Sequence, residues 1–257
     1  MKSEKFATAI RFSPFRFSLF TLHSSLKTQD MIFQLDENFW FPDPHLAETE
    51  GEFGWEGMLA VGGDLSPERL KLAYSLGIFP WFNFRQRELT PVWYCPQTRF
   101  VIFPHEIHVS HSMRTLMNKR RYRLSMNENF VGVINNCSSL RIHMRGAWLG
   151  RKMVAAYTKL HEMGIAKSVE VWEKDDQAKN GERLVGGLYG VWTPNCFAGE
   201  SMFSLVPSAS KLALIHLART LQSVEGAVID CQFHTPHLES MGGRHISYDD
   251  MISHIIK

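Results

Sequence analysis

The stretch that decides the fold begins with FAGESMFS (Phe197 to Ser204), continues through the apolar segment Ala209 to Leu221, and ends in AVIDCQ (Ala227 to Gln232). The first and last pieces are apolar and bounded by turn formers, which is typical of short buried strands. The middle piece has the length and spacing of a helix. The sequence therefore predicts two buried strands separated by a helix.

Three polar residues, Glu200, Asp230 and Gln232, lie at the ends of these strands, where a sheet can direct side chains into one cleft. A carboxylate inside an apolar strand is costly unless it is hydrogen-bonded or used, because burying an unpaired charge carries a large desolvation penalty. Two interpretations follow. The carboxylates either pair with basic groups and hold strands together, or they belong to a catalytic site, since structural ion pairs imitate active sites.

The composition of the 257-residue chain is ordinary for a globular protein of one large or two small domains. The formal charge of +2 does not by itself demand a nucleic-acid partner. The four cysteines form no CxxC pair, which favours reduced thiols in a cytosolic protein over disulfides. No apolar run approaches the roughly 20 residues that span a bilayer. We expect a cytoplasmic location.

The N-terminal part divides into two segments. Residues 1–30 are rich in Ser, Phe, Lys and Arg, and we interpret them as a disordered extension or a mis-assigned start. Residues 31–96 are expected to form a small N-terminal domain. Its clearest element is a helix from Pro67 to Leu76, with Ser66 as N-cap and Gly77 as terminator. An aromatic-rich loop is expected to follow, at residues 77–82.

Residues 97–257 are expected to form a second domain. Strands are predicted at 99–103, 167–173 and 184–192, and helices at 112–121, 127–137 and 236–241, with a further helix after Trp148. The glycines of the 184–192 strand indicate a bulge or a close approach by a ligand. Antiparallel strands with helices between them favour an α+β fold over a doubly wound sheet.

A basic cluster follows the first strand of this domain. It could neutralise phosphates, although cations at a helix C-terminus are also common on solvated surfaces. Its members are Arg114, Lys119, Arg120, Arg121 and Arg123. Two histidine-containing runs, at residues 105–111 and 231–237, lack the paired spacing of a structural zinc site. We expect no metal.

Together, several long motifs resemble the bacterial leucyl/phenylalanyl-tRNA-protein transferase family. The motifs are GGDLSPERL (62–70), AYSLGIFPWF (73–82), the aromatic-bearing helix at 148–164, SVEVW (168–172), GESMFS (199–204) and IDCQ (229–232). The resemblance implies a small N-terminal domain joined to a GNAT-like (acetyltransferase-like) domain with a central, mostly antiparallel sheet flanked by helices. It also implies transfer of Leu or Phe, and Met less well, from aminoacyl-tRNA to proteins that begin with Arg or Lys. Such transfer creates an N-degron, and it requires no cofactor.

The resemblance assigns roles residue by residue. Glu200, Asp230 and Gln232 would form the catalytic polar end. Tyr74 and Trp81 would lie near the terminal adenosine of the tRNA, and the basic cluster would contact the acceptor stem, with Arg114, Lys119, Arg120 and Arg121 as phosphate contacts. The aminoacyl side chain would be held by an apolar pocket lined by Trp148, Tyr157, Phe197 and Met202, with Leu188 where the family has Met.

Two other functions remain open from the residues alone. An acetyl-CoA-dependent acetyltransferase would share the fold, but the chain has no RxxGxG/A loop opening a helix to hold a pyrophosphate. A non-catalytic receptor for basic N-termini would need Glu200 and Asp230 but no adenosine site. We expect a monomer that binds no membrane.

Overall fold

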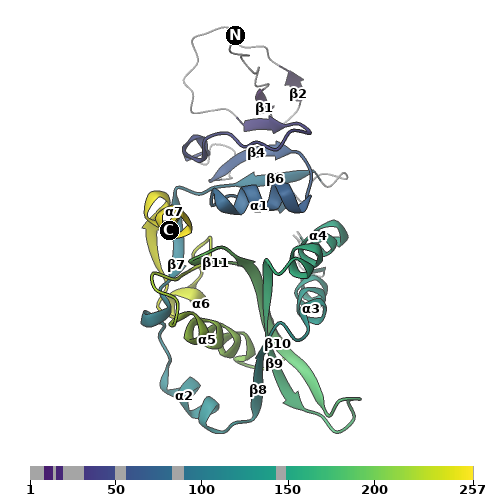
Figure 1. Cartoon of the computed structure of the whole chain (residues 1–257), viewed down its shortest axis with the longest axis vertical. Coiled ribbons are helices and arrows are strands. Elements are labelled where there is room, and N and C mark those ends of the chain that lie inside the picture. The colour runs from purple at the N-terminus through teal and green to yellow at the C-terminus, as the bar shows by residue number, and fades with distance from the viewer. Residues whose placement is uncertain are drawn as a thin grey trace. The chain divides into compact units, whose positions relative to one another are not determined.

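The structure, a computed structural model, describes residues 9–13, 16–19, 32–49, 56–82, 90–142 and 149–256. The chain divides into two compact units, Met1–Gln97 and Thr98–Lys257. Each unit contains its own sheet, and helices accompany both sheets (Figure 1). The architecture is therefore α+β, as the sequence predicts.

The first unit is built on a six-stranded sheet with strand order β2-β1-β3-β4-β6-β5. Two of its strands, β1 and β2, fall within residues 1–30, and the rest of that stretch lies outside the described residues. Strands β3 and β4 pair in parallel. The elements of this unit are β1 (Ala9–Ser13), β2 (Arg16–Leu19), β3 (Ile32–Leu35), the short 3-10 helix η2 (Pro44–Leu46), β4 (Met58–Gly62), α1 (Pro67–Ser75), β5 (Phe79–Phe82) and β6 (Pro91–Tyr94).

Helix α1 begins and ends where its local signals place it. The Ser66 hydroxyl accepts a 3.3 Å hydrogen bond from the backbone N–H of Arg69, and Pro67 occupies the first turn. Gly77 closes the helix with φ of +67°, in the left-handed region that favours glycine. The expected loop at 77–82 is wrong in part, because Phe79–Phe82 forms β5 and pairs with β6. Pro80 is tolerated there because β5 is an edge strand.

The second unit is built on a seven-stranded sheet with strand order β13-β7-β12-β11-β10-β9-β8. All neighbouring strands pair antiparallel except β11 and β12, which pair in parallel. The strands are β7 (Thr98–Ile102), β8 (Tyr122–Met126), β9 (Ala166–Lys174), β10 (Glu182–Trp192), β11 (Cys196–Ser204), β12 (Val228–Asp230) and β13 (Arg244–Ser247). The mostly antiparallel sheet that the sequence predicts is confirmed.

Helices cover both faces of this sheet (Figure 1). Helices α3 and α4 lie on one face, and α5 packs on the other against β9, β10 and β11. The core on the α5 face joins Val169, Val171 and Leu188 from the strands to leucines of the helix. The helices and the remaining 3-10 turn are η3 (Pro104–Glu106), α2 (His111–Asn118), α3 (Phe130–Ile142), α4 (Arg151–Glu162), α5 (Ala209–Leu221), α6 (Pro236–Glu239) and α7 (Tyr248–Ile256).

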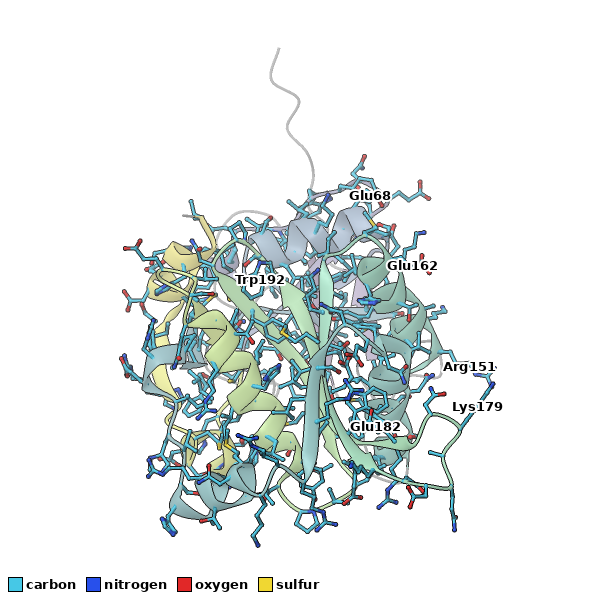
Figure 2. The ribbon with its side chains drawn as sticks, turned by 60° about the horizontal axis from the view of Figure 1, so that its bottom comes forward. Glu68, Arg151, Glu162, Lys179, Glu182 and Trp192 are labelled. Atoms are coloured by element: carbon cyan, nitrogen blue, oxygen red, sulfur yellow. The ribbon has the colours of Figure 1, made fainter. Side chains whose placement is uncertain are left out.

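The long β9–β10 hairpin extends beyond the helices that flank it. Its turn is polar and exposed, and Figure 2 shows the side chain of Lys179 projecting from this turn at the periphery. The turn corresponds to the polar insert between the two predicted strands. This end of the hairpin contributes no residue to the cavity described below.

One irregularity in the pairing of β10 with β11 shapes the centre of the sheet. In the β10–β11 pairing, Tyr189 lies opposite Ser201 and Gly190 lies opposite Gly199, so Glu200 is an extra residue on β11. Such a bulge bends the strand and redirects a side chain. Gly190 is required here, since a Cβ at that position would collide with the carbonyl oxygen of Ala198. A bulge therefore lies beside these glycines, with its extra residue on β11, whereas the close approach by a ligand stays a prediction.

Strands β11 and β12 pair over a short length only. The parallel pairing joins Cys196, Phe197 and Ala198 to residues 228–230 and then stops. Beyond Ala198, β11 continues to Ser204 with β10 as its only partner strand among the described residues. The two strands therefore separate on the side where Glu200 and Gln232 lie.

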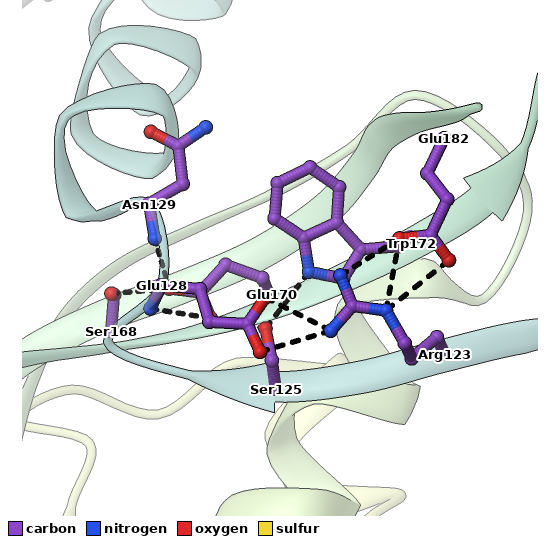
Figure 3. A network of polar contacts seen from close by, with 8 residues as sticks. All are labelled: Arg123, Ser125, Glu128, Asn129, Ser168, Glu170, Trp172 and Glu182. Atoms are coloured by element: carbon purple, nitrogen blue, oxygen red, sulfur yellow. Dashed lines mark hydrogen bonds and ion pairs between the residues drawn. The ribbon is translucent and has the colours of Figure 1, made fainter. Parts of the chain in front are cut away.

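A buried carboxylate holds α3 against the sheet. Glu170 of β9 is completely buried and accepts hydrogen bonds from the hydroxyls of Ser125 (2.6 Å) and Ser168 (2.5 Å) (Figure 3). The backbone N–H groups of Glu128 and Asn129, at the start of α3, also donate to it at 3.4 Å. A carboxylate at this end of a helix complements the positive end of the helix dipole. Glu170 therefore has a structural role.

Candidate active site

A cavity of about 330 Å³ lies where β11 and β12 separate. Both strands contribute to it, together with α5 and the segment that follows β12. Most of its wall is apolar, from Leu188, Phe197, Met202, Leu214, Leu217 and Ile229. A smaller polar part is formed by Glu200, Ser201, Gln232 and His237. A wall of this kind can hold an apolar group at one end and a polar or charged group at the other.

Glu200 is fixed in the cavity wall by two hydrogen bonds. The Tyr157 hydroxyl of α4 donates to Oε2 at 2.8 Å, and the side-chain amide of Gln232 donates to Oε1 at 3.0 Å. Only 7% of Glu200 is exposed. Each carboxylate oxygen therefore has a donor, which offsets the cost of burying the charge. The carboxylate of Glu200 is held in place before any ligand enters.

Gln232 occupies a strained backbone position directly after β12. Its φ is +66°, in the left-handed region that residues other than glycine rarely adopt. Its backbone N–H donates to Oδ1 of Asp230 at 2.9 Å, and its carbonyl accepts from Phe100 at 3.3 Å. Because Glu200 accepts from the amide nitrogen, the amide oxygen of Gln232 remains, and it accepts no hydrogen bond from the described residues. A strained residue held this way is typical of a functional site.

Asp230 lies behind the cavity, in contact with a buried cation. Both of its carboxylate oxygens are bonded to Arg99 of β7, with Nε to Oδ1 at 3.3 Å and Nη2 to Oδ2. Arg99 and Asp230 are 1% and 2% exposed. For Asp230, the structure therefore agrees with the ion-pair interpretation, and the same carboxylate positions the backbone of Gln232.

The remaining residues predicted to bind the aminoacyl group occupy different places. Phe197 and Met202 line the cavity. Tyr157 is completely buried behind Glu200 and packs its ring on Tyr189, with centroids 5.5 Å apart, so it supports the wall rather than lining it. Trp148 lies outside the described residues.

The two residues predicted to lie near the adenosine belong to the first unit. Tyr74 is 3% exposed. Trp81 is half-buried, and its ring packs edge-on against Tyr94 with centroids 5.6 Å apart. Of the two, Trp81 has the larger exposed surface.

Two of the five cations in the basic cluster are already paired with carboxylates. Arg121 forms an ion pair with Glu173 at 2.5 Å. Arg123 pairs with Glu128 and Glu182 and lies over the ring of Trp172 (Figure 3). In contrast, the cations of Arg114, Lys119 and Arg120 are exposed and form no ion pair with the residues that the structure describes.

Sequence reasoning missed several residues at or behind the cavity, among them Arg99, Ser201 and His237. Arg99 begins an apolar run, and a cation at such a position signals a buried carboxylate partner. Ser201 and His237 carry no comparable signal. Each has a buried polar atom, Oγ and Nε2 respectively, without a hydrogen-bond partner among the described residues.

Burial changes the acid–base properties of two residues that line the cavity. Burial, reinforced by the charge of Lys211, lowers the pKa of His237 below its ordinary value of 6.5. Burial, together with the negative charge of Asp230, raises the pKa of the Cys231 thiol above its ordinary value. At neutral pH both groups are therefore uncharged.

The described residues contain neither a candidate metal site nor a candidate membrane-spanning helix. No group of three or more His, Cys, Asp or Glu side chains is placed to hold a metal ion. None of the helices in the described part of the chain combines the length and apolarity needed to cross a membrane.

Comparisons with known proteins agree on one family. The family model for leucyl/phenylalanyl-tRNA protein transferase matches residues 101–255, and the model for its N-terminal domain matches residues 63–97. A leucyl/phenylalanyl-tRNA–protein transferase of Flavobacterium johnsoniae is 45% identical over 86% of this chain and 98% of its own length. One from Nitrosomonas eutropha is 50% identical over 74% of this chain and 77% of its own.

Similarity to solved structures is more distant. FemX is 10% identical, with a TM-score of 0.46 over 94% of this chain and 86% of its own. L-PGS from Bacillus licheniformis is 10% identical, with a TM-score of 0.41 over 80% of this chain and 74% of its own. The family assignment rests instead on the two family models and on the curated relatives, which match the chain across both compact units. The chain belongs to the leucyl/phenylalanyl-tRNA–protein transferase family.

Proposed function

We propose that the protein transfers Leu or Phe, and Met less well, from aminoacyl-tRNA to the α-amino group of proteins that begin with Arg or Lys, and so creates an N-degron. Its family is one of N-end rule aminoacyltransferases. The observation that carries the proposal is the single cavity in which an apolar wall meets Glu200 and Gln232.

The reaction is an acyl transfer from an activated ester. The neutral amine nitrogen bonds to the ester carbonyl carbon, and the carbonyl electron pair moves onto oxygen. Collapse of this intermediate restores the carbonyl and breaks the bond to the ribose oxygen, which takes up the proton released by nitrogen. The enzyme must therefore orient an amine and stabilise a developing oxyanion.

Gln232 is suited to orient the amine. Its amide oxygen is an acceptor without a partner among the described residues, and an attacking amine has N–H groups to donate. Asp230 acts through Gln232: it holds the Gln232 backbone N–H at 2.9 Å, and Arg99 fixes Asp230. Asp230 is then a positioning residue, whereas Gln232 contacts the substrate.

Glu200 is suited to hold positive charge. Its carboxylate faces the cavity and can attract either the acceptor's amino group before deprotonation or the cationic side chain of an N-terminal Arg or Lys. The charge of Glu200 would then explain why basic N-termini are accepted. A neutral or acidic N-terminal side chain gains nothing from it.

The apolar wall is suited to the transferred side chain. Leu188, Phe197 and Met202 offer no hydrogen bonds, so a polar side chain placed against them would lose its contacts with water. Such a pocket discriminates weakly among apolar side chains, because one methylene is worth only about 1–3 kcal/mol. Loose selectivity among Leu, Phe and Met follows.

The unpaired cations of Arg114, Lys119 and Arg120 are our candidates for contacts with tRNA phosphates. Because their charge is not offset by described carboxylates, they can release counterions on binding RNA. Arg121 is a weaker candidate because Glu173 already pairs with it. We place the protein in the cytoplasm, where aminoacyl-tRNA is available, and expect a monomer.

Transfer of labelled Leu tests the proposal. The protein is incubated with charged tRNA and either an Arg-starting peptide or the same peptide acetylated at its N-terminus. We expect label only on the free peptide, and uncharged tRNA should compete. An acetyltransferase would label the peptide from acetyl-CoA instead, and a receptor would bind the peptide without labelling it.

A further inference from the structure

Ser201 carries a buried hydroxyl that lacks a partner. Only 7% of the residue is exposed, and Oγ forms no hydrogen bond with any described residue. Two other buried serines of the same sheet are satisfied: the hydroxyls of Ser125 and Ser168 both donate to Glu170. Since buried polar atoms in native proteins are nearly always bonded, the exception requires an explanation.

The position of Ser201 explains why its hydroxyl has no partner within the described protein. It lines the cavity beside Glu200, directly after the bulged residue, and lies opposite Tyr189 in the register with β10. Beyond Ala198 no described strand pairs with the β12 side of β11. The hydroxyl therefore sits in the part of β11 that faces the site, where a bound substrate could supply its partner.

The site has acceptors but few available donors. Glu200 accepts hydrogen bonds, and the amide nitrogen of Gln232 already donates to it, which leaves the Gln232 oxygen as an acceptor. An ester carbonyl that gains negative charge needs a donor fixed in advance. Among the side-chain atoms at the cavity, Oγ of Ser201 and Nε2 of His237 are buried without a hydrogen-bond partner in the described residues, and Ser201 is the more completely buried of the two residues, since His237 is partly exposed.

We propose that Ser201 is a further catalytic residue, whose hydroxyl donates a hydrogen bond to the carbonyl oxygen of the aminoacyl ester as that oxygen becomes negative. The inference rests on the proposed function, because it assumes that the ester is bound in this cavity. No covalent bond to Ser201 forms. The hydroxyl is available because no described group of the protein competes for it.

The test compares alanine variants of two buried serines, Ser201 and Ser168, for which we expect opposite effects on transfer rate and melting temperature. Ser201→Ala should lower the single-turnover rate of Leu transfer about 10²-fold, the size of effect seen when one such donor is removed. Its melting temperature should be unchanged or higher, because an unsatisfied hydroxyl is lost. Ser168→Ala should behave in the reverse way, with a lower melting temperature and a transfer rate within twofold of wild type.

A second measurement separates a role in the transition state from a role in binding. The affinity for a tRNA that carries Leu through a non-reactive amide should be the same for wild type and Ser201→Ala. Ser201→Cys is nearly isosteric with wild type, but its thiol is a weak hydrogen-bond donor, so this variant should also transfer Leu slowly. It takes the place of Ser201→Ala in the test if the alanine variant does not fold.

The wild-type protein is measured first in the same assay. If it transfers no Leu, the proposed function fails. If it transfers Leu and both Ser201 variants match its rate, only the present inference fails. Equal losses of rate and of affinity for the amide analogue would also overturn the inference, because Ser201 would then bind the ground state alone.

Discussion

The side-chain amide of Gln232 donates a 3.0 Å hydrogen bond to Oε1 of Glu200. Glu200 lies on β11 and Gln232 follows β12, the parallel neighbour of β11, and the bond forms beyond the point where the pairing of those strands ends. It therefore ties together two strands that have separated around a cavity. Because the bond uses the amide nitrogen of Gln232, the amide oxygen is the atom left to accept a hydrogen bond from a substrate.

Removing the hydroxyl of Tyr157 should loosen this arrangement. Tyr157→Phe keeps the ring packing on Tyr189 but deletes the 2.8 Å bond to Glu200, so we expect a loss of about 1.5–3 kcal/mol in the free energy of unfolding. Slower transfer should accompany it. The control is Thr158→Val on the same helix, which deletes only a bond to Val154. Urea unfolding and single-turnover transfer check both variants, and equal transfer rates for the two would contradict the prediction.

The buried pair of Arg99 and Asp230 should behave as one unit. Arg99→Met and Asp230→Asn should each cost about 3–5 kcal/mol, because each leaves a buried charge without its partner. The double variant should cost much less than the sum of the two. A double-mutant cycle from urea unfolding measures the difference. Additive losses would show that the two side chains stabilise the fold independently.

Enlarging the apolar wall should change the preference among donors. Met202→Ala widens the cavity, so transfer of Phe should rise relative to transfer of Leu, by roughly 5- to 150-fold for about 1–3 kcal/mol of altered contact. Met113→Ala is the control, since Met113 is equally apolar but lies on α2 and does not line the cavity. The two ratios are measured in competition between Phe-tRNA and Leu-tRNA. An unchanged Phe-to-Leu ratio in Met202→Ala would place the side chain elsewhere.

The carboxylate of Glu173 should make stability depend on pH. Hydrogen bonds from Arg183 and then Arg121 lower the pKa of Glu173 below its ordinary value of 4.5. A lowered pKa in the folded state means that the stabilisation is fully present above about pH 4.5 and is lost as the pH falls through the lower, folded-state pKa.

Glu173→Gln should therefore be less stable than wild type at pH 7, and the difference should shrink steadily in acid. Urea unfolding between pH 7 and pH 3 follows it. Glu225→Gln, at an exposed position without an ion pair among the described residues, is the control. A difference that stays constant down to pH 3 would rule out ionisation as its source.

Local signals predicted the elements well. The cap at Ser66 and the terminator Gly77 fixed the ends of α1, and the apolar spacing of Ala209–Leu221 gave α5 with its observed bounds. These features depend on residues a few positions apart, which a sequence displays directly. The strand β5 was predicted as a loop because its pairing with β6 depends on residues further along the chain. The composition of Phe79–Phe82 does not reveal that partner strand.

The geometry of the site depends on distant residues, and the sequence could not show it. Glu200, Gln232, Phe197 and Met202 were predicted to share one cavity, and they do. The bond between Arg99 and Asp230 spans 131 positions in the chain, and the displacement of Glu200 depends on the register between β10 and β11. Sequence reasoning could therefore identify the polar residues of the site but not which of them reach its surface.

The measurement that tests the central claim most directly is single-turnover transfer of labelled Leu to an Arg-starting peptide by wild type and Gln232→Ala, both saturated with Leu-tRNA. We expect wild type to form the labelled peptide, and the variant to do so about 10²-fold more slowly at a temperature where both proteins are folded, since removing a positioned contact to the reacting group costs about this much. The melting temperature of the variant should also fall, because the bond from Gln232 to Glu200 is lost. Equal rates in the two proteins would contradict the account, because the amide oxygen of Gln232 would then have no part in guiding the amine.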